Sequence, residues 1–264
     1  MRKGVLHCHS TYSDGEFSLE ELRAIFVAAG CQFACVTDHA DSVDAETLAS
    51  YTDECEQRSD AAFRFIAGLE YTCRNRLHVL GYGSTVLIDS TDPQEVIRRI
   101  RAAGGVAVIA HPRDDAFARI ETFETLPDGI ETWNSKYDGR YAPRPGTFAL
   151  LARLKARRPD MTAFFGQDLH WKAQYRGLFT EVECETADRA SVLGALRSGA
   201  YAGVKDRLRL PSSGEVAPDL LARFARAHRR SQLIRRAIKQ GEAWADGIGV
   251  MLPSAMKAHL RRIF

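Results

Sequence analysis

Residues 4–9 read GVLHCH, a short apolar run that ends in two histidines separated by one residue. Such a run, followed by a helical pattern, is typical of a strand in a sheet that helices cover. Side chains two positions apart on a strand point to the same face. We therefore expect His7 and His9 to address one site and Cys8 to face the other way.

Similar apolar runs recur through the first 204 residues. The further strand candidates are 33–39, 63–70, 76–82, 105–112, 129–134, 161–170 and 180–185. Helical patterns separate most of them, and the one at 18–30 starts with Ser18 and Glu21 in the spacing of a capping box. Seven or eight such units predict a mostly parallel α/β sheet that closes into a distorted barrel.

Length and composition are those of a globular chain with one large domain, at 264 residues and 45% hydrophobic content. No apolar run is long enough to span a membrane, and the first residues do not resemble a signal peptide. A cytoplasmic enzyme is therefore the expectation. The six cysteines form no CxxC pair, so we expect them to be reduced and mostly buried.

The charge is divided unevenly along the chain. Residues 1–204 carry 23 Lys and Arg against 29 Asp and Glu, whereas residues 205–264 carry 13 against 5. The second segment contains a long amphipathic basic helix pattern and a short helix pattern beginning near Ser254. We expect a helical extension packed on the barrel. Its basic face could meet nucleic acid, or it could be a plain solvated face.

The histidines are placed where strands end. Six of the eight lie at or just beyond the carboxyl end of a predicted strand, or on a short strand of their own: His7, His9, His39, His78, His111 and His170. Glu70 and Asp168 also lie at strand ends. Because the strands of a parallel barrel end at one face, these side chains should meet there. Imidazole and carboxylate ligands together suit Zn, Mn or Fe, so the pattern predicts a polynuclear metal site.

Seven motifs resemble, in order and spacing, those of the PHP (polymerase and histidinol phosphatase) domain family. They are HCHSTYSDG (7–15), VTDH (36–39), GLEYT (68–72), HVLGYG (78–83), IAHP (109–112), GIETWN (129–134) and GQDLH (166–170). The resemblance spans roughly residues 1–204. It implies a distorted (β/α)7 TIM-like barrel, followed here by the extension at 205–264. Members of this family hydrolyse phosphate mono- or diesters at a trinuclear centre, and some are accessory domains of DNA polymerases.

The resemblance implies nine ligands for up to three divalent ions of Mn, Zn or Fe. The first ion would be held by His7, His9, Asp168 and Glu70. The second would be held by Glu70, as a bridge, with His78 and His111. The third would be held by Asp14, His39 and His170.

The expected reaction is hydrolysis of a nucleotide or another small phosphorylated metabolite. A hydroxide bridging two metals would attack phosphorus, because metal coordination lowers the pKa of water towards neutrality. Glu70, Asp168 and His170 are the expected catalytic residues. A water on the third ion is the favoured proton donor to the leaving group, and a histidine of the centre is the alternative.

A phosphate clamp should contain cations at the same face. The candidates are Arg113, Lys136, Lys172 and Arg176, each with a plain surface charge as its alternative. Glu131 and Asn134 end their own strand, and either line the pocket or make structural hydrogen bonds.

Two other functions stay open from the sequence. One is an exonuclease-like phosphodiesterase that holds a nucleic-acid backbone with the basic extension. The other is a non-catalytic, regulatory metal-binding module. A metal-dependent amidohydrolase is also conceivable on a related barrel. Oligomeric state and substrate are not determined by these residues.

Overall fold

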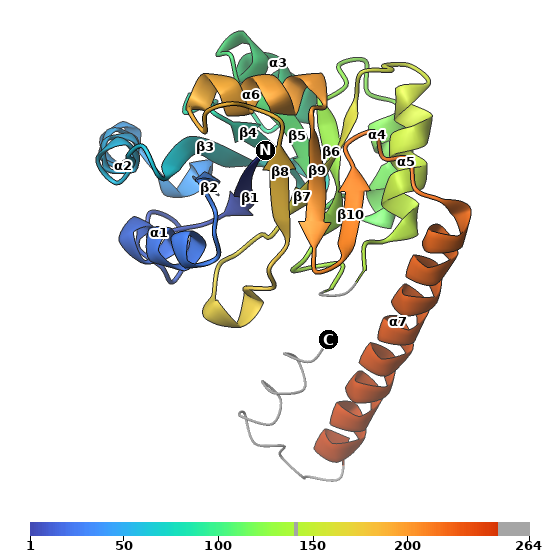
Figure 1. Ribbon diagram of the computed structural model, residues 1–264. Coiled ribbons are helices and arrows are strands. Elements are labelled where there is room, and N and C mark those ends of the chain that lie inside the picture. The colour runs from blue at the N-terminus through green and yellow to red at the C-terminus, as the bar shows by residue number, and fades with distance from the viewer. Residues whose placement is uncertain (140–141, 248–264) are drawn as a thin grey trace.

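The computed structural model describes residues 1–139 and 142–247, in which ten strands form one sheet with helices on its outer side (Figure 1). In sheet order the strands are β10 (Leu208–Pro211), β9 (Tyr201–Lys205), β8 (Phe179–Val182), β1 (Arg2–Cys8), β2 (Phe33–His39), β3 (Arg64–Cys73), β4 (Leu77–Tyr82), β5 (Val106–Ala110), β6 (Gly129–Asn134) and β7 (Thr162–Gly166). Each of the eight predicted strands is present, and β9 and β10 are additional.

Strands β1 to β7 curve into a distorted barrel, which confirms the predicted fold class. The residues just after β7 close it: Gln167 N donates to Leu6 O at 3.0 Å and Asp168 N to His7 O at 2.7 Å. His9 N donates in turn to Leu169 O at 2.9 Å. The start of β1 pairs instead with β8, so the first strand has different neighbours at its two ends. The carboxyl ends of β1 and β7 are thereby held side by side.

The prediction of a mostly parallel sheet is wrong for β4 and for β8 to β10. Strand β4 runs antiparallel to both β3 and β5. Only the 3-10 turn Arg74–Arg76 joins β3 to β4, and a parallel crossover needs a dozen or more residues. The connection length therefore sets the direction of β4.

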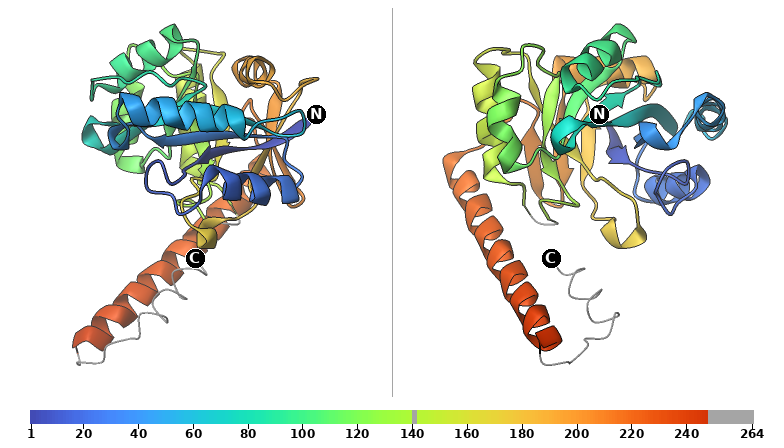
Figure 2. Two further views of the ribbon diagram at one scale, coloured as in Figure 1. Left: turned by 90° about the vertical axis from the view of Figure 1, so that its left-hand side faces the viewer. Right: turned by 180° about the vertical axis from the view of Figure 1, so that it is seen from behind.

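Six helices lie around the outside of the barrel, as the two views of Figure 2 show. They are α1 (Leu19–Ala28), α2 (Ala45–Gln57), α3 (Pro93–Ala102), α4 (Phe117–Glu121), α5 (Pro145–Lys155) and α6 (Arg189–Ser198). The predicted capping box is confirmed at α1, where Ser18 and Glu21 cap each other. Apolar side chains from these helices pack on the sheet, and five of the six cysteines are buried.

The chain continues beyond the barrel as helix α7 (Pro218–Gly247), which projects away from the body (Figure 1, Figure 2). Its first turns contact the barrel: Phe224 is buried, and Leu220 and Leu221 pack against the core. The predicted division after residue 204 stays a prediction; this position lies within β9, and β10 follows it. The short helix predicted near Ser254 falls outside the described residues.

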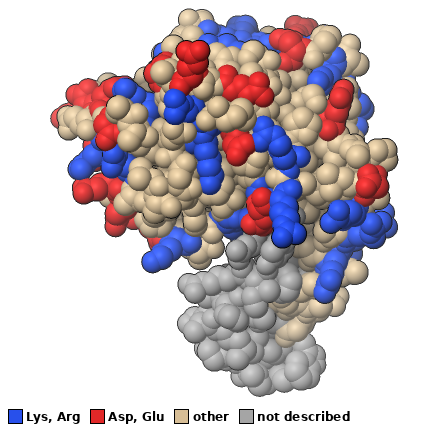
Figure 3. Space-filling model, in the orientation of Figure 1, with Lys and Arg blue, Asp and Glu red and all other residues tan. Residues whose placement is uncertain are grey.

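Acidic and basic side chains are interspersed over the barrel face seen in Figure 3. Among the helices that the structure describes, none is both long and apolar enough to cross a membrane.

Candidate metal centre

The nine predicted ligands come together at one face of the barrel. His7 lies at a bulge in β1, His39 ends β2, Glu70 lies in β3, and the others follow β1, β5 or β7 or begin β4. His78 is near the start of β4, not at its end. Because β4 is antiparallel, its start lies where the parallel strands end. The strand that departs from the predicted direction thus still delivers its histidine to the site.

Glu70 is at the middle of the group and is almost completely buried. Its Oε2 lies 3.1 Å from Nε2 of both His7 and His9. Its Oε1 lies 2.7 Å from His78 Nδ1 and 3.2 Å from His111 Nε2. Burial alone would raise the pKa of Glu70, but the neighbouring imidazoles hold it well below its ordinary value. Each oxygen of this ionised carboxylate thus faces two imidazoles, as a bridging ligand requires.

Asp168 is the second buried carboxylate. Its Oδ1 lies 3.1 Å from His170 Nδ1 and 3.8 Å from Nε2 of His7 and of His9, and its Oδ2 lies 3.7 Å from His111 Nε2. Burial would raise the pKa of Asp168, but the adjacent imidazoles and Lys136 hold it well below the ordinary value. It therefore contributes a second ionised oxygen donor between the same rings.

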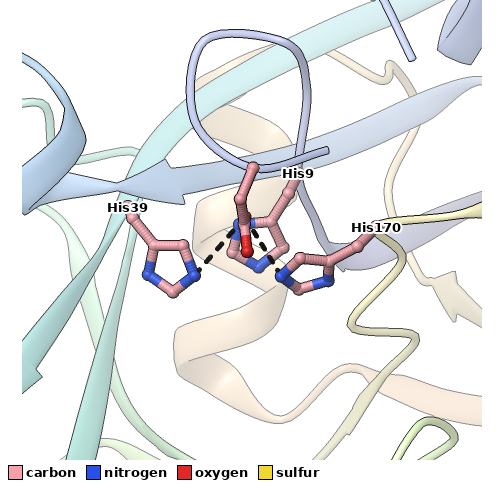
Figure 4. Close-up of side chains that lie close together, drawn as sticks. His9, His39 and His170 are labelled. Atoms are coloured by element: carbon pink, nitrogen blue, oxygen red, sulfur yellow. Dashed lines mark ion pairs between the residues drawn. The ribbon is translucent and has the colours of Figure 1, made fainter. Parts of the chain in front are cut away.

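Asp14 forms the outer part of the centre and is 54% exposed. Figure 4 shows the rings of His9, His39 and His170 converging on one carboxylate. Asp14 Oδ1 lies 3.2 Å from His170 Nε2, 3.6 Å from His39 Nε2 and 3.9 Å from His9 Nδ1. The segment after β1 thus brings Asp14 together with its own His9 and with His39 and His170, which come from two other places in the chain.

The donor atoms fall into three overlapping sets, each with its atoms within 4.8 Å of one another. The sets are His9, Asp14, His39 and His170; His7, His9 and Asp168; and His7, Glu70 and His111. They resemble the three predicted sets with three differences: His9 is added to the outer set, Glu70 is missing from the set of His7, His9 and Asp168, and His7 replaces His78 in the last. Such clusters can bind metal ions.

His9 provides a test of whether metal ions fit these donors. Both ring nitrogens of His9 are buried, and neither makes a hydrogen bond of normal geometry with the residues that the structure describes, although Nε2 lies 3.1 Å from Glu70 Oε2. Burial lowers the pKa of His9 to about 3, so the ring is neutral and its lone pair is available. An unsatisfied buried polar atom costs about 1–3 kcal/mol. A divalent ion would satisfy it, and the mixed nitrogen and oxygen donors suit Zn, Mn or Fe.

Glu131 has a role that the sequence left open between pocket lining and structural bonding. It is fully buried, and its Oε1 lies 2.8 Å from His7 Nδ1. Its Oε2 accepts from His111 N and from Asn134 Nδ2, both at 2.8 Å, and Asn134 Nδ2 also lies 3.2 Å from Asp168 Oδ2. Because a carboxylate accepts at His7 Nδ1, His7 Nε2 is left facing the centre. Glu131 therefore orients ligands instead of facing substrate.

Gly166 makes room for this carboxylate. A Cβ atom at position 166 would lie 1.7 Å from Glu131 Oε1. The glycine of the GQDLH motif is a signal from which a close backbone approach could have been predicted, because glycine in a strand often marks one.

The backbone at the centre is strained. Three of the ligands have positive φ angles, 60° at His7, 26° at His111 and 52° at Asp168. Residues held in such regions cost about 1–3 kcal/mol each and cluster at functional sites. At His7 the strain coincides with the β1 bulge, so this bulge, and not simple strand alternation, sets how His7 and His9 converge.

The four predicted phosphate contacts differ in position. Lys136 contacts two of the predicted metal ligands: its Nζ lies 3.0 Å from Asp168 Oδ1 and 3.2 Å from His170 Nδ1. Arg113 points to Asp115 at 3.2 Å and is 59% exposed. Arg176 donates to Ser135 O at 2.5 Å, and Lys172 is exposed. Their substrate roles stay predictions.

The family model of the PHP domain matches residues 6–137, which is half of the chain. The chain belongs to the PHP domain family. One relative of this PHP protein is the DNA polymerase/3'-5' exonuclease PolX of Bacillus subtilis (strain 168), 30% identical over 145 residues. The match covers 46% of this chain and 25% of PolX, so it spans a quarter of that relative's length.

Solved structures share the fold of this PHP chain. A two-domain protein of Bacteroides vulgatus ATCC 8482, which contains a predicted PHP-like metal-dependent phosphoesterase, has a TM-score of 0.55 and 16% identity, covering 85% of this chain and 69% of its own. PsfC of Pseudomonas syringae PB-5123 has a TM-score of 0.54 and 14% identity, covering 87% and 98%. An amidohydrolase of Chromobacterium violaceum with bound sulfate has a TM-score of 0.50 and 17% identity, covering 73% and 96%. At these identities the likeness establishes the fold alone.

Proposed function

We propose that this chain is a metal-dependent phosphoesterase that hydrolyses a phosphate mono- or diester of a nucleotide or another small metabolite. The observation that carries the proposal is Glu70, an ionised buried carboxylate with two imidazole nitrogens within 3.2 Å of each oxygen. Two ions bridged by one carboxylate are the arrangement that many phosphatases use for in-line displacement at phosphorus. Family membership supports the same reaction class.

The nine clustered residues would hold up to three ions of Mn, Zn or Fe. When bound, these ions would lower the pKa of water and neutralise charge on the phosphoryl oxygens. Glu70 and Asp168 would hold them with two ionised carboxylates, and Glu131 would keep His7 turned towards them. His170, which lies between Asp14 and Asp168, would complete the outer position.

Lys136 would contribute a fixed positive charge to the same place. Its ammonium lies next to Asp168 and His170 and is partly exposed. A phosphoryl oxygen that approaches the centre would therefore meet both the ions and this ammonium. We assign Lys136 to the phosphate clamp ahead of Arg113, Lys172 and Arg176.

The test is phosphate release by the full chain, reconstituted with Mn, Zn or Fe, across mononucleotides, sugar phosphates, cyclic phosphates and bisphosphates. Metal content is measured on the same preparation. Asp168→Ala should lose most of the bound metal and at least about a hundredfold in kcat/KM, since a first ligand contributes more than the outer partners for which 10- to 100-fold is typical. Asp53→Ala, on the exposed side of α2, is the matched control. Unchanged turnover in Asp168→Ala would refute the proposal.

An exonuclease-like phosphodiesterase is the second candidate. The similarity to PolX, a DNA polymerase/3'-5' exonuclease, and the basic projecting helix α7 favour it. Release of nucleotides from a single-stranded oligonucleotide, with no turnover of mononucleotides, would select it. Binding of metal with no hydrolysis of phosphate esters would instead indicate a regulatory module, or an amidohydrolase if an amide or lactone is cleaved.

A further inference from the structure

Two aromatic side chains stand half exposed beside the metal centre. Tyr137, in the loop after β6, is 50% exposed, and Trp171, in the loop after β7, is 48% exposed. Six large apolar side chains are exposed among the described residues, and these two are the aromatic ones. A single exposed apolar residue needs no explanation. Two exposed aromatic rings from different loops at the same site do need an explanation.

Both rings lie against predicted metal ligands. The ring centroid of Tyr137 is 4.7 Å from that of His111, and the centroid of Trp171 is 5.6 Å from that of His170. His111 and His170 themselves contact Asp168 from two sides, at 3.7 and 3.1 Å. The aromatic pair therefore borders the centre on the His111 side and on the His170 side.

Lys136 connects the two rings. Its Nζ lies 5.3 Å from the Tyr137 centroid and 5.9 Å from the Trp171 centroid, and the same atom is 3.0 Å from Asp168 Oδ1. A cation at this distance from an aromatic face is attracted to it, which fixes the ammonium between the rings. The ammonium of Lys136 is thus close both to the two rings and to the place where a phosphate would bind.

We propose that Tyr137 and Trp171 form a ring-binding subsite that stacks the planar base of a nucleotide while its phosphate reaches the metal centre. This inference rests on the proposed function and names its substrate class as base-bearing phosphate esters. Stacking of a base on an aromatic side chain is tolerant of base identity, because every base has a flat π face. Lys136 lies between the base and the centre, where the phosphate of such a molecule carries its charge.

The experiment compares adenosine 5′-monophosphate with ribose 5-phosphate, which has the same phosphate and no base. The full metal-loaded chain should show a kcat/KM at least about tenfold higher for the nucleotide, the size expected for one base stacked on one aromatic ring. Tyr137→Leu and Trp171→Leu keep apolar bulk but remove the ring. Each should raise KM several-fold more for the nucleotide than for ribose 5-phosphate, which has no base to stack. Tyr137→Phe and Trp171→Phe should restore the preference. Val27→Ala, another exposed apolar position, is the control.

A binding measurement separates this proposal from the proposed function. Tryptophan fluorescence of the full chain should be quenched on titration with the nucleotide and not with ribose 5-phosphate, and Trp171→Leu should abolish the change. This result requires no turnover. A short single-stranded oligonucleotide, titrated in parallel, shows whether the base belongs to a free nucleotide or to a chain end.

The proposal is overturned if wild type treats both phosphates alike, or if the leucine variants lose both substrates equally, because the rings would then only support the centre. If no phosphate ester is hydrolysed but the nucleotide quenches Trp171, the proposed reaction fails and the subsite stands. If phosphate esters are hydrolysed without base preference or quenching, the proposed reaction stands and the subsite fails.

Discussion

Glu131 shows how one residue outside the ligand set can determine the geometry of the centre. Its two oxygens contact His7 Nδ1, the backbone N–H of His111 and, through Asn134, the surroundings of Asp168. It thereby links strands β1, β5 and β6 and the segment after β7 at one point.

We predict that Glu131→Gln lowers the affinity for Mn or Zn by about 10- to 100-fold, the range seen when a carboxylate behind a metal-bound histidine is lost. The variant keeps the shape of the side chain and removes its charge, so His7 Nδ1 loses a charged acceptor. Calorimetric titration with the metal alone measures the effect. Glu124→Gln, at an exposed position, should titrate like wild type. Equal affinities for all three proteins would show that Glu131 does not orient a ligand.

We predict that Gly166→Ala destabilises the fold by about 1–3 kcal/mol, because an added methyl group in a packed site forces neighbours to move. The new Cβ would overlap Glu131 Oε1 and lie 3.0 Å from His7 Cβ, so metal affinity should fall as well. Thermal melts and the same titration test both effects.

Gly194→Ala is the matched control for this change. It lies inside α6, where a Cβ meets no atom within 4 Å among the described residues. Alanine is the better helix former by about 1 kcal/mol, so this variant should be slightly more stable than wild type. Destabilisation by both substitutions alike would indicate that crowding at Glu131 is not the cause.

The convergence of these histidines and carboxylates could be predicted at this scale, because histidine and carboxylate at successive strand ends are a specific pattern. The strained φ angles of His7, His111 and Asp168 could not, since nothing in the one-letter sequence records a bulge. The hydrogen bonds of Glu131 could not either. Of its three partners, His7 is far away in sequence, His111 bonds through its backbone, and only Asn134 is a nearby side chain.

Single elements were predicted well in extent and less well in direction. The capping residues of α1 and the strand at 76–82 can be read from local pattern. The antiparallel course of β4 depends on the three-residue turn before it, and apolar periodicity is the same in either direction. The direction in which α7 projects depends on which of its residues pack against the barrel, and the sequence pattern does not show this.

We predict that the part of α7 beyond Ala227 can be removed without unfolding the barrel. A chain that ends at Ala227 keeps Phe224, whose burial joins the helix to the body. It loses most of the Arg and Lys residues of the extension. Its melting temperature should stay within about 3 °C of wild type, since surface changes are usually worth less than about 0.5 kcal/mol.

The same shortened chain tests whether α7 meets nucleic acid. If it does, retention on single-stranded DNA should fall steeply with salt for the full chain and should be weak at all salt concentrations for the shortened one. Identical retention of the two proteins would remove α7 from any nucleic-acid function. A large loss of stability would show instead that the outer helix supports the barrel.

On the scale of the whole molecule, the barrel could be predicted from seven or eight alternating units and a family resemblance. The way it closes could not. Closure depends on residues 167–169 pairing with the end of β1 and on β8 pairing with its start. Those contacts join residues that are far apart in sequence. They depend on how the whole sheet packs, which local sequence patterns do not record.

We predict that metal ions stabilise the whole fold. At a free metal concentration of about 100 times Kd, a ligand that binds only the folded state adds about 2.7 kcal/mol, or roughly 5–10 °C in Tm for a domain of this size. The ions would also relieve the closeness of two ionised carboxylates, Glu70 and Asp168. Melts with Mn or Zn and with excess chelator measure the difference. Asp168→Ala should show a much smaller shift, and an equally large one would locate the stabilising ion elsewhere.

The hydrogen bonds between the end of β1 and residues 167–169 have a consequence for synthesis of the protein. His7 and His9 leave the ribosome well before Asp168 and His170, because they precede them in the chain. A nascent chain that has not yet reached residue 167 carries His7 and His9 without Asp168 and His170, and it lacks the hydrogen bonds that close the barrel. If the centre binds metal as proposed, its full ligand set would come together only when the barrel closes.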